Sequence, residues 1–320
     1  MQHPTPKSHD SLLLFLTLLL LTSCGKDKIE LTWEEQNSNI NTVLTSVYFT
    51  DANTGHVMGG ETWAKGYYLS TIDGGANWEV DSLANKRLNG LIFKPSGKGY
   101  AVGVDGYFFK KESPLEDWFF YRLPRWEILT DVCFNNADEG MVVGGAAFKS
   151  GVAMRIEGTA VTQIDTFKNE LAAVCYSDDN TVHAVGYGIV LRSDSGGPWE
   201  RKDIEGDFFR AIHFPSQEVG YVVGSAGTIM KTTDGGLKWD KIRDGSKIRV
   251  SNKPFRDVFF VNEDRGYIVG EGGLFWITEN GGDDWKVVKN FSGDDLLSVH
   301  VVDGHGHVVS EQGGIFHFEE

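Results

Sequence analysis

The segment Thr71-Ile72-Asp73-Gly74-Gly75-Ala76-Asn77-Trp78 decides the fold, because the chain repeats it. It returns almost unchanged as Thr232-Thr233-Asp234-Gly235-Gly236-Leu237-Lys238-Trp239. Looser copies are Arg192-Ser193-Asp194-Ser195-Gly196-Gly197-Pro198-Trp199 and Thr278-Glu279-Asn280-Gly281-Gly282-Asp283-Asp284-Trp285. Self-similarity at a period of roughly forty residues is typical of a radial array of small β-sheets.

Each repeat opens with a short apolar stretch, and seven such stretches follow one another along the chain. Examples are Val47-Tyr48-Phe49, Ile212-His213-Phe214 and Val258-Phe259-Phe260. A second stretch lies between glycines, as in Gly220-Tyr221-Val222-Val223-Gly224, and a third leads into the Asp-Gly-Gly turn. Short runs that are apolar on both sides suit strands covered by a neighbour on each face. The sequence therefore predicts an all-β, seven-bladed β-propeller with four strands in each blade.

The two ends of the chain are expected to meet. The last repeat stops after Gly313-Gly314-Ile315-Phe316-His317-Phe318, before any fourth strand. Near the other end, Leu31-Thr32-Trp33-Glu34-Glu35 resembles the fourth strand of another repeat, Asn77-Trp78-Glu79-Val80. We expect this N-terminal strand to complete the last blade, which would remove two exposed sheet edges. Residues 29–320 then form one domain.

The repeated pattern Thr-x-Asp-x-Gly-x-x-Trp is the Asp-box, or bacterial neuraminidase repeat. Together with the Gly-Tyr-Val-Val-Gly stretch, the longer repeat resembles the photosystem II assembly and stability factor family of seven-bladed propellers. The resemblance extends over residues 29–320. It implies a non-enzymatic module that docks a protein or peptide, with arginines on one face of the ring holding the partner. Only Arg210 and Arg256 carry this feature over, four residues before Phe214 and Phe260.

Residues 1–23 are predicted to be a signal peptide, since Lys7 precedes an apolar core from Leu12 to Leu21. That core is about half the length needed to span a bilayer. It ends in Leu21-Thr22-Ser23-Cys24, which resembles the bacterial lipobox. We expect a lipoprotein anchored through Cys24, with a tether over residues 24–28, in the bacterial cell envelope. The outer membrane is expected, on its periplasmic side or at the cell surface. The alternative is a chance cysteine behind an ordinary signal peptide.

Charge and cysteine content narrow the classes of partner. The formal net charge is −15, which argues against nucleic acid, since phosphate binding needs a basic surface. Cys133 and Cys175 occupy matching positions in neighbouring repeats, which are usually too far apart for a disulfide. We expect two buried free thiols, no metal site, no cofactor and a monomer.

The Asp-box residues are interpreted as scaffold. A carboxylate or amide there can accept backbone N–H groups of the following turn, and the second glycine can supply a positive φ. The tryptophan can then cover the hairpin. A repeated metal or sugar site is the alternative, but the boxes are splayed around the rim and cannot converge. The residues concerned are Asp73, Asp194, Asp234 and Asn280, with Trp78, Trp199, Trp239 and Trp285.

A ligand is expected on the face opposite the Asp-boxes, near the channel. Guanidinium groups there could hold a carboxylate or an acidic peptide tail. The alternative is that the long loop before the sixth blade is a solvated insertion with internally paired charges. His213 and His300, at equivalent inner-strand positions, are expected to pack between blades. The candidate binding residues are Arg210, Arg256, Arg249, Arg125, Trp126 and Glu271.

The rival class is a carbohydrate-active enzyme, either sialidase-like or glucan-hydrolase-like. It would need two acids opposed at roughly 5–10 Å across a groove lined by Trp63 or Trp126. The acids expected on this face are Glu61, Asp105, Glu271 and Glu311. The Arg-Ile-Pro segment of sialidases is missing. Arginines crowding the channel mouth without opposed acids would favour docking.

Overall fold

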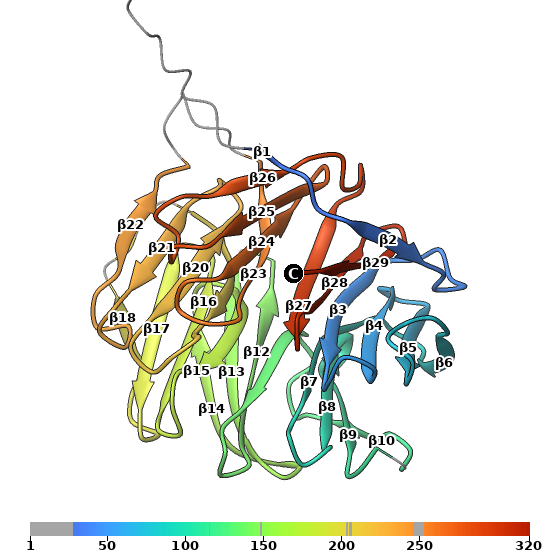
Figure 1. The fold of residues 1–320 in the computed structure, drawn as a ribbon. Helices are drawn as coiled ribbons and strands as arrows, with labels where there is room; N and C mark the ends of the chain where they lie inside the picture. The colour runs from blue at the N-terminus through green and yellow to red at the C-terminus, as the bar shows by residue number, and fades with distance from the viewer. Residues whose placement is uncertain (1–27, 115, 148, 203, 205–206, 246–252) are drawn as a thin grey trace, which may run out of the picture.

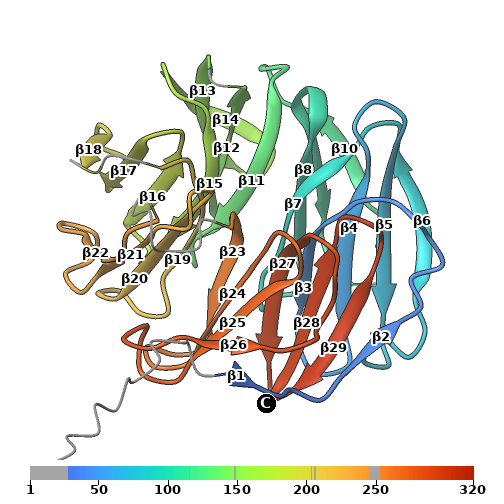
Figure 2. The ribbon, with the colours of Figure 1, turned by 90° about the horizontal axis from the view of Figure 1, so that it is seen from above.

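The structure, a computed structural model, describes residues 28–114, 116–147, 149–202, 204, 207–245 and 253–320. Seven sheets are arranged around a central channel, which confirms the predicted seven-bladed β-propeller (Figures 1 and 2). The predicted signal peptide and Cys24 lie outside the described residues. Within the described ranges, no helix combines the length and the apolarity that crossing a bilayer requires.

The blades follow the order of the chain, and in each of the first six the strands run from the channel outward. Blade one contains β3 (Leu44–Phe49), β4 (Gly55–Glu61), β5 (Lys65–Thr71) and β6 (Glu79–Ala84). Blade two contains β7 (Leu88–Phe93), β8 (Gly99–Gly103), the 3₁₀ turn η1 (Val104–Gly106), β9 (Tyr107–Lys111) and β10 (Phe119–Arg122). Blade three contains β11 (Ile128–Phe134), β12 (Glu139–Ala146), β13 (Ser150–Glu157) and β14 (Ala160–Phe167).

The remaining blades repeat this plan. Blade four contains β15 (Leu171–Tyr176), β16 (Thr181–Gly186), β17 (Ile189–Asp194) and β18 (Glu200–Lys202). Blade five contains β19 (Phe209–His213), β20 (Gly220–Gly224), β21 (Ile229–Thr232) and β22 (Asp240–Arg243). Blade six contains β23 (Phe255–Phe260), β24 (Gly266–Gly270), β25 (Leu274–Thr278) and β26 (Lys286–Val288). Blade seven contains β27 (Leu296–Val302), β28 (His305–Ser310), β29 (Ile315–Glu319) and β2 (Trp33–Gln36).

Blade seven is closed by the N-terminal strand, as predicted. Strand β2 pairs antiparallel with β29, from Trp33 opposite Phe318 to Gln36 opposite Ile315. The blue and red strands lie side by side in both views (Figures 1 and 2). The Trp33 ring packs 5.0 Å from Phe291 and 5.7 Å from Phe316, between ring centroids. Apolar packing therefore supports this non-covalent closure.

A further strand was not predicted from the sequence. Strand β1 (Lys28–Ile29) pairs in parallel with β26, with Lys28 opposite Val287 and Ile29 opposite Val288. It becomes the fifth and outermost strand of blade six. The N-terminal segment thus contacts two blades in succession.

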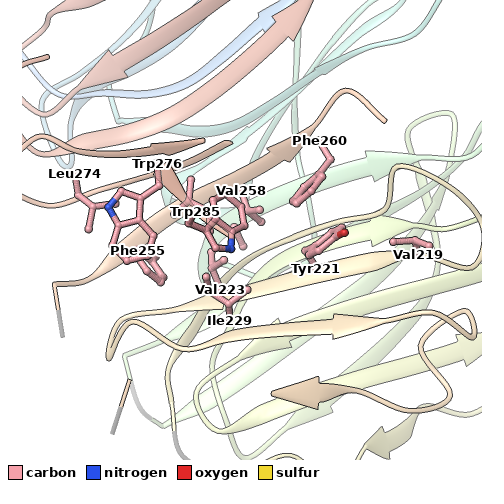
Figure 3. Close-up of a cluster of buried hydrophobic side chains, with 12 residues drawn as sticks. Val219, Tyr221, Val223, Ile229, Phe255, Val258, Phe260, Leu274, Trp276 and Trp285 are labelled. Atoms are coloured by element: carbon pink, nitrogen blue, oxygen red, sulfur yellow. The ribbon is translucent and has the colours of Figure 1, made fainter. Parts of the chain in front are cut away.

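Neighbouring blades are held together by stacked aromatic rings. Tyr221 of β20 stacks on Phe260 of β23 with centroids 3.7 Å apart and planes 6° from parallel (Figure 3). A Cβ added at Gly220 would lie 2.5 Å from the Phe214 ring of its own blade. The glycine of this Gly-Tyr pair therefore leaves room for the aromatic ring of its own blade, and the tyrosine stacks on the aromatic ring of the next blade. Equivalent stacks join four other pairs of blades: His56 on Phe93, Tyr100 on Phe134, His183 on Phe214 and His307 on Phe49.

Candidate functional site

Three of the four predicted Asp-boxes have the expected hairpin geometry. In blade one, Asp73 Oδ1 accepts the Asn77 backbone N–H at 2.9 Å and the Thr71 hydroxyl at 2.7 Å. These hydrogen bonds, with that from the Asn77 side chain foremost, lower the pKa of Asp73 to about 2. The second glycine, Gly75, has a φ of 91°. Matching bonds join Asp234 to Lys238 at 2.8 Å and Asn280 to Asp284 at 2.9 Å.

Three of the Asp-boxes also join their blade to the one before it. The carbonyl of the first glycine in the box points at the preceding blade and accepts a hydrogen bond there. The donors are Gln36 to Gly74 at 2.8 Å, Arg192 to Gly235 at 3.1 Å and Lys231 to Gly281 at 2.8 Å. These contacts support the interpretation of the boxes as scaffold.

Blade four departs from the predicted box. Ser193, opposite Val182, takes the position that Thr232 takes opposite Gly220, so the stretch from there to the tryptophan is one residue shorter than in the other boxes. Arg192 pairs with Asp194. The other Asp194 oxygen accepts the Thr181 hydroxyl at 3.0 Å in place of a turn N–H. Trp199 packs against Phe167 of blade three, with centroids 6.1 Å apart. In this looser copy the Ser193 hydroxyl donates to the Gly197 carbonyl at 2.7 Å, where the Thr71 hydroxyl of blade one accepts the Gly75 N–H.

The central channel has a volume of about 530 Å³ and is lined by the innermost strand of every blade. We call the end where the loops enter these strands the mouth face. The second residue of each repeated inner-strand segment, counted from this face, contributes one ring of the lining. This ring is Thr45, Asn89, Thr130, Ala172, Arg210, Arg256 and Leu297. Two guanidinium groups therefore lie on adjacent blades in an otherwise uncharged ring.

Arg210 and Arg256 have different surroundings. The Arg210 Nε donates to the Ser225 hydroxyl at 2.7 Å, and its guanidinium carbon lies 3.8 Å from the Phe208 ring centroid. Burial lowers the pKa of Arg210, and the charge of Arg256 adds to this effect. Arg256 forms an ion pair with Glu271. Among the described residues, no carboxylate is within ion-pair distance of Arg210.

Arg87 is a residue that the sequence interpretation missed. Its Nε donates to Asn89 Oδ1 of the channel lining at 2.9 Å. Burial lowers its pKa, and Glu311 acts in the opposite direction. Its position just before an inner strand could have indicated that Arg87 lies at the mouth face. It was missed because Arg87 does not occupy the repeat position of Arg210 and Arg256. The mouth face thus has a third partly buried cation, on the opposite side of the ring from Arg210 and Arg256.

The other predicted binding residues are arranged as follows. Glu271 is the ion-pair partner of Arg256, so both belong to the channel mouth. Arg125 is held by Glu127, whose two oxygens lie 3.0 and 3.2 Å from its Nε, and it is not part of the channel lining. Trp126 is 70% exposed. Arg249 lies outside the described residues.

Deeper in the channel, polar side chains join adjacent inner strands. Asp257 accepts the Val299 N–H of blade seven at 2.9 Å, and Asp131 accepts the Val174 N–H of blade four at 2.9 Å. Burial raises the pKa of Asp131 to about 7 and that of Asp257 to about 6.

Two histidines of the channel lining also accept a backbone N–H from the next blade. His213 accepts the Phe260 N–H and His300 the Phe49 N–H, each at 3.3 Å. Their predicted packing between blades is confirmed.

The two thiols and another acid considered for this face have the following surroundings. Cys133 and Cys175 are free thiols in the channel wall, as predicted, although Cys175 is only partly buried. Burial raises the pKa of both thiols. Asp105 is held between Lys86 and Arg122 in ion pairs. Within the described ranges, no group of three or more His, Cys, Asp or Glu residues is placed to hold a metal ion.

Comparisons with known proteins agree with this architecture. Residues 194–320 match the model of a family described as Photosynthesis system II assembly factor YCF48. No curated protein matches the sequence significantly. A solved structure of YCF48 bound to D1 peptide is similar over 92% of this chain and 100% of its own, with a TM-score of 0.71 and 14% identity.

Two further solved structures share the fold. YCF48 from Cyanidioschyzon merolae has a TM-score of 0.69 and 16% identity, with 90% of this chain and 98% of its own covered. Virginiamycin B lyase from Staphylococcus aureus has a TM-score of 0.69 and 11% identity, with 91% and 100% covered. The protein is thus an Asp-box, seven-bladed propeller that resembles the photosystem II assembly factor YCF48 family.

Proposed function

We propose that this protein is a non-enzymatic docking module that binds a carboxylate-bearing segment of a partner protein at its channel mouth. The observation that carries the proposal is the pair Arg210 and Arg256 on adjacent blades. A guanidinium group can hold a carboxylate through two parallel hydrogen bonds. A bound anion would also offset the mutual repulsion and the burial that lower the pKa of Arg210.

The resemblance supports a peptide as the ligand. The YCF48 structure with a bound D1 peptide shows that a propeller of similar fold accepts a peptide. For this chain we infer a partner of its own, defined by chemistry as an extended segment with a terminal or side-chain carboxylate. A role in assembling a larger complex is part of the same proposal.

Catalysis is less well supported than docking. Of the four acids considered for a glycosidase, Asp105 is paired with Lys86 and Arg122, and Glu271 with Arg256. None of the four lines the channel. We therefore infer that the mouth face binds its ligand without transforming it.

The test is binding of fluorescent peptides that end in a free or an amidated C-terminus. We expect Arg210→Ala/Arg256→Ala to weaken binding of the free-acid peptides by about tenfold or more, since each lost charged bond contributes about 1.5–3 kcal/mol. The matched control is Lys238→Ala/Lys241→Ala, which removes two exposed cations far from the channel. Equal affinities of the wild type and the channel variant would refute the docking site.

We further propose that Cys24 is lipidated and anchors the domain in a bacterial envelope membrane. The support is the apolar segment from Leu12 to Leu21 followed by the lipobox-like Leu21-Thr22-Ser23-Cys24. Several acyl chains on one cysteine give stable membrane attachment. Mass spectrometry of the N-terminal peptide from cells should find acylated Cys24, and Cys24→Ser should release the protein from membranes. An unmodified Cys24 in the mature protein would exclude this anchor.

A further inference from the structure

The outer strand of blade two differs from the other outer strands of the described chain. In β10, Phe119 and Phe120 are each 50% exposed and Tyr121 is 37% exposed. Outer strands normally carry charges that discourage further pairing, and most of the other blades do so. Exposed charges or hydroxyls are Glu34 and Glu35 on β2, Glu79 and Asp81 on β6, Thr162 and Thr166 on β14, Glu200 and Arg201 on β18, and Asp240 and Lys241 on β22.

Two of the exposed rings of β10 pack against aromatic side chains of β9. The Phe120 ring lies 4.8 Å from Tyr107 and 5.2 Å from Phe109, between centroids. Tyr121 lies 6.3 Å from Phe108. The Phe120 and Tyr121 rings therefore rest on β9 and remain partly exposed. Successive side chains of a strand point to opposite faces, so Phe119 and Tyr121 lie on one face of β10 and Phe120 on the other. An outermost strand that is apolar on both faces is a template for pairing with another strand.

The end of β10 at the mouth face has an excess positive charge among aromatic rings. Arg122 lies 5.1 Å from the Tyr107 centroid and 5.3 Å from that of Trp126. Lys86 lies 5.3 Å from the same Tyr107 ring. Both cations pair with Asp105, and the Arg122 bond is 2.5 Å long. Two cations against one carboxylate leave a net positive charge at this end, in a protein whose formal net charge is −15.

The molecule itself shows that an apolar outer strand in this ring can accept another strand. In blade six, β26 ends in Val287 and Val288, and β1 pairs with both residues. That blade has five strands, whereas blade two has four and β10 is its outermost strand. Addition of an extended segment to a free edge supplies main-chain hydrogen bonds for affinity and side-chain contacts for specificity.

We propose that β10 is a β-augmentation site that binds an extended segment of another protein as the fifth strand of blade two. The segment presents apolar side chains to Phe119, Phe120 and Tyr121 and an acidic residue to Arg122. Charge selects this partner over a second copy of the chain. Two copies would bring two cationic Lys86–Asp105–Arg122 clusters to one interface and join two strongly acidic chains.

The test uses synthetic eight-residue peptides of alternating valine and threonine, with two glutamates at one end, and the full-length protein. Glutamates are placed at the N-terminus in one peptide and at the C-terminus in another, because the segment can run in either direction. Two peptides with lysines in those places are the charge controls. By fluorescence anisotropy, one glutamate peptide is expected to bind about tenfold more tightly than its lysine counterpart.

Two variants locate the binding. Arg122→Glu should reverse the preference in favour of the lysine peptide, whereas the control Lys241→Glu on β22 should leave it unchanged. Phe119→Ser/Tyr121→Ser should weaken the glutamate peptide about tenfold, and Ile164→Ser on β14 is its matched control. These side chains are partly exposed, so thermal unfolding of each variant should stay close to that of the wild type.

Hydrogen exchange gives the decisive readout. The bound peptide should slow exchange in residues 119–122, and this protection should persist in Arg210→Ala/Arg256→Ala, which separates the result from the proposed channel site. Protection of the inner strands instead, or failure of all four peptides to bind, would overturn the proposal. So would spontaneous disulfide dimers of Phe120→Cys beyond the wild-type level, because they would identify a second copy as the occupant.

Discussion

His300 Nδ1 accepts the backbone N–H of Phe49 at 3.3 Å and thereby joins the last blade to the first across the closure of the ring. A histidine that accepts at Nδ1 must be neutral, because both ring nitrogens donate in the charged form. Burial agrees with this state: it lowers the pKa of His300 to about 3 and that of His213 to about 4. Burial also lowers the pKa of His56, His183 and His307 to about 3.

The first prediction is that mild acid destabilises the protein. In the unfolded chain these five histidines titrate near 6.5, so below that pH the unfolded state binds more protons and stability falls toward pH 3–4. At pH 5 each histidine costs about 2 kcal/mol. Asp131 and Asp257 act in the opposite direction, because their raised pKa values let the folded protein bind protons as the pH falls. Between pH 7 and 5 these two carboxyl groups together increase the free energy of unfolding by about 4 kcal/mol.

The measurement is urea unfolding at pH 7.5 and pH 5. The free energy of unfolding should be lower at pH 5 by about 6 kcal/mol. A variant with the buried His56 replaced by phenylalanine should have a smaller difference. Equal or greater stability at pH 5 would contradict the assignment of neutral, buried histidines.

The second prediction concerns the closure of the ring. Trp33→Ala removes a ring that packs on Phe291 and Phe316, and it should lower the free energy of unfolding by about 2–4 kcal/mol. Glu35→Ala on the same strand is exposed and should change it by less than about 0.5 kcal/mol. Deleting residues 29–36 should lower the unfolding temperature still further. An unchanged midpoint for Trp33→Ala would mean that β2 contributes little to stability.

The third prediction concerns the Asp-box. The buried Thr71 hydroxyl accepts the Gly75 N–H at 3.0 Å and donates to Asp73 at 2.7 Å. Thr71→Val leaves that N–H without a partner and should cost about 1–3 kcal/mol. Thr166→Val, at an exposed position of β14, is the control and should be near neutral. Equal effects of the two substitutions in thermal unfolding would remove the structural role assigned to the box.

The fourth prediction depends on the proposed function. Glu271 competes with any incoming carboxylate for Arg256, because the two side chains already form an ion pair. Glu271→Gln should therefore tighten binding of a peptide with a free C-terminal carboxylate, by about three- to tenfold. Glu263→Gln, exposed on another loop, should have no effect. Weaker binding by Glu271→Gln would indicate that this carboxylate contacts the ligand directly.

Much of the fold follows from the sequence because the determinants are local and repeated. Tyr221 stacks on Phe260, and the same Gly-Tyr pattern places Tyr100 on Phe134. Repetition shows which positions are equivalent, so one correct assignment extends to the other blades. The pairing of Trp33 with Phe318 could be inferred as well, because a missing strand at one end matched an extra strand at the other.

The remaining features depend on contacts that no repeat encodes. β1 is only two residues long and carries no period, so its pairing with β26 gave no signal. The blade-four box is one residue shorter than the others, and the repeated pattern did not show how its hydrogen bonds would change. The ion pair between Arg256 and Glu271 joins a strand to a hairpin fifteen residues further along the chain. Whether the two side chains meet depends on the backbone path between them. Sequence placed these two residues on one face but could not show that they neutralise each other.

The position of β1 determines how the ring would stand on a surface. Lys28 belongs to the outermost strand of blade six, so the described chain begins at the perimeter of the disc and not at the centre of either flat side. If Cys24 carries lipid, the four residues up to Lys28 span at most about 14 Å. The propeller would then be attached to the membrane at the outer edge of blade six. Its two flat faces and the outer edge of blade two, on the far side, would be accessible to partners.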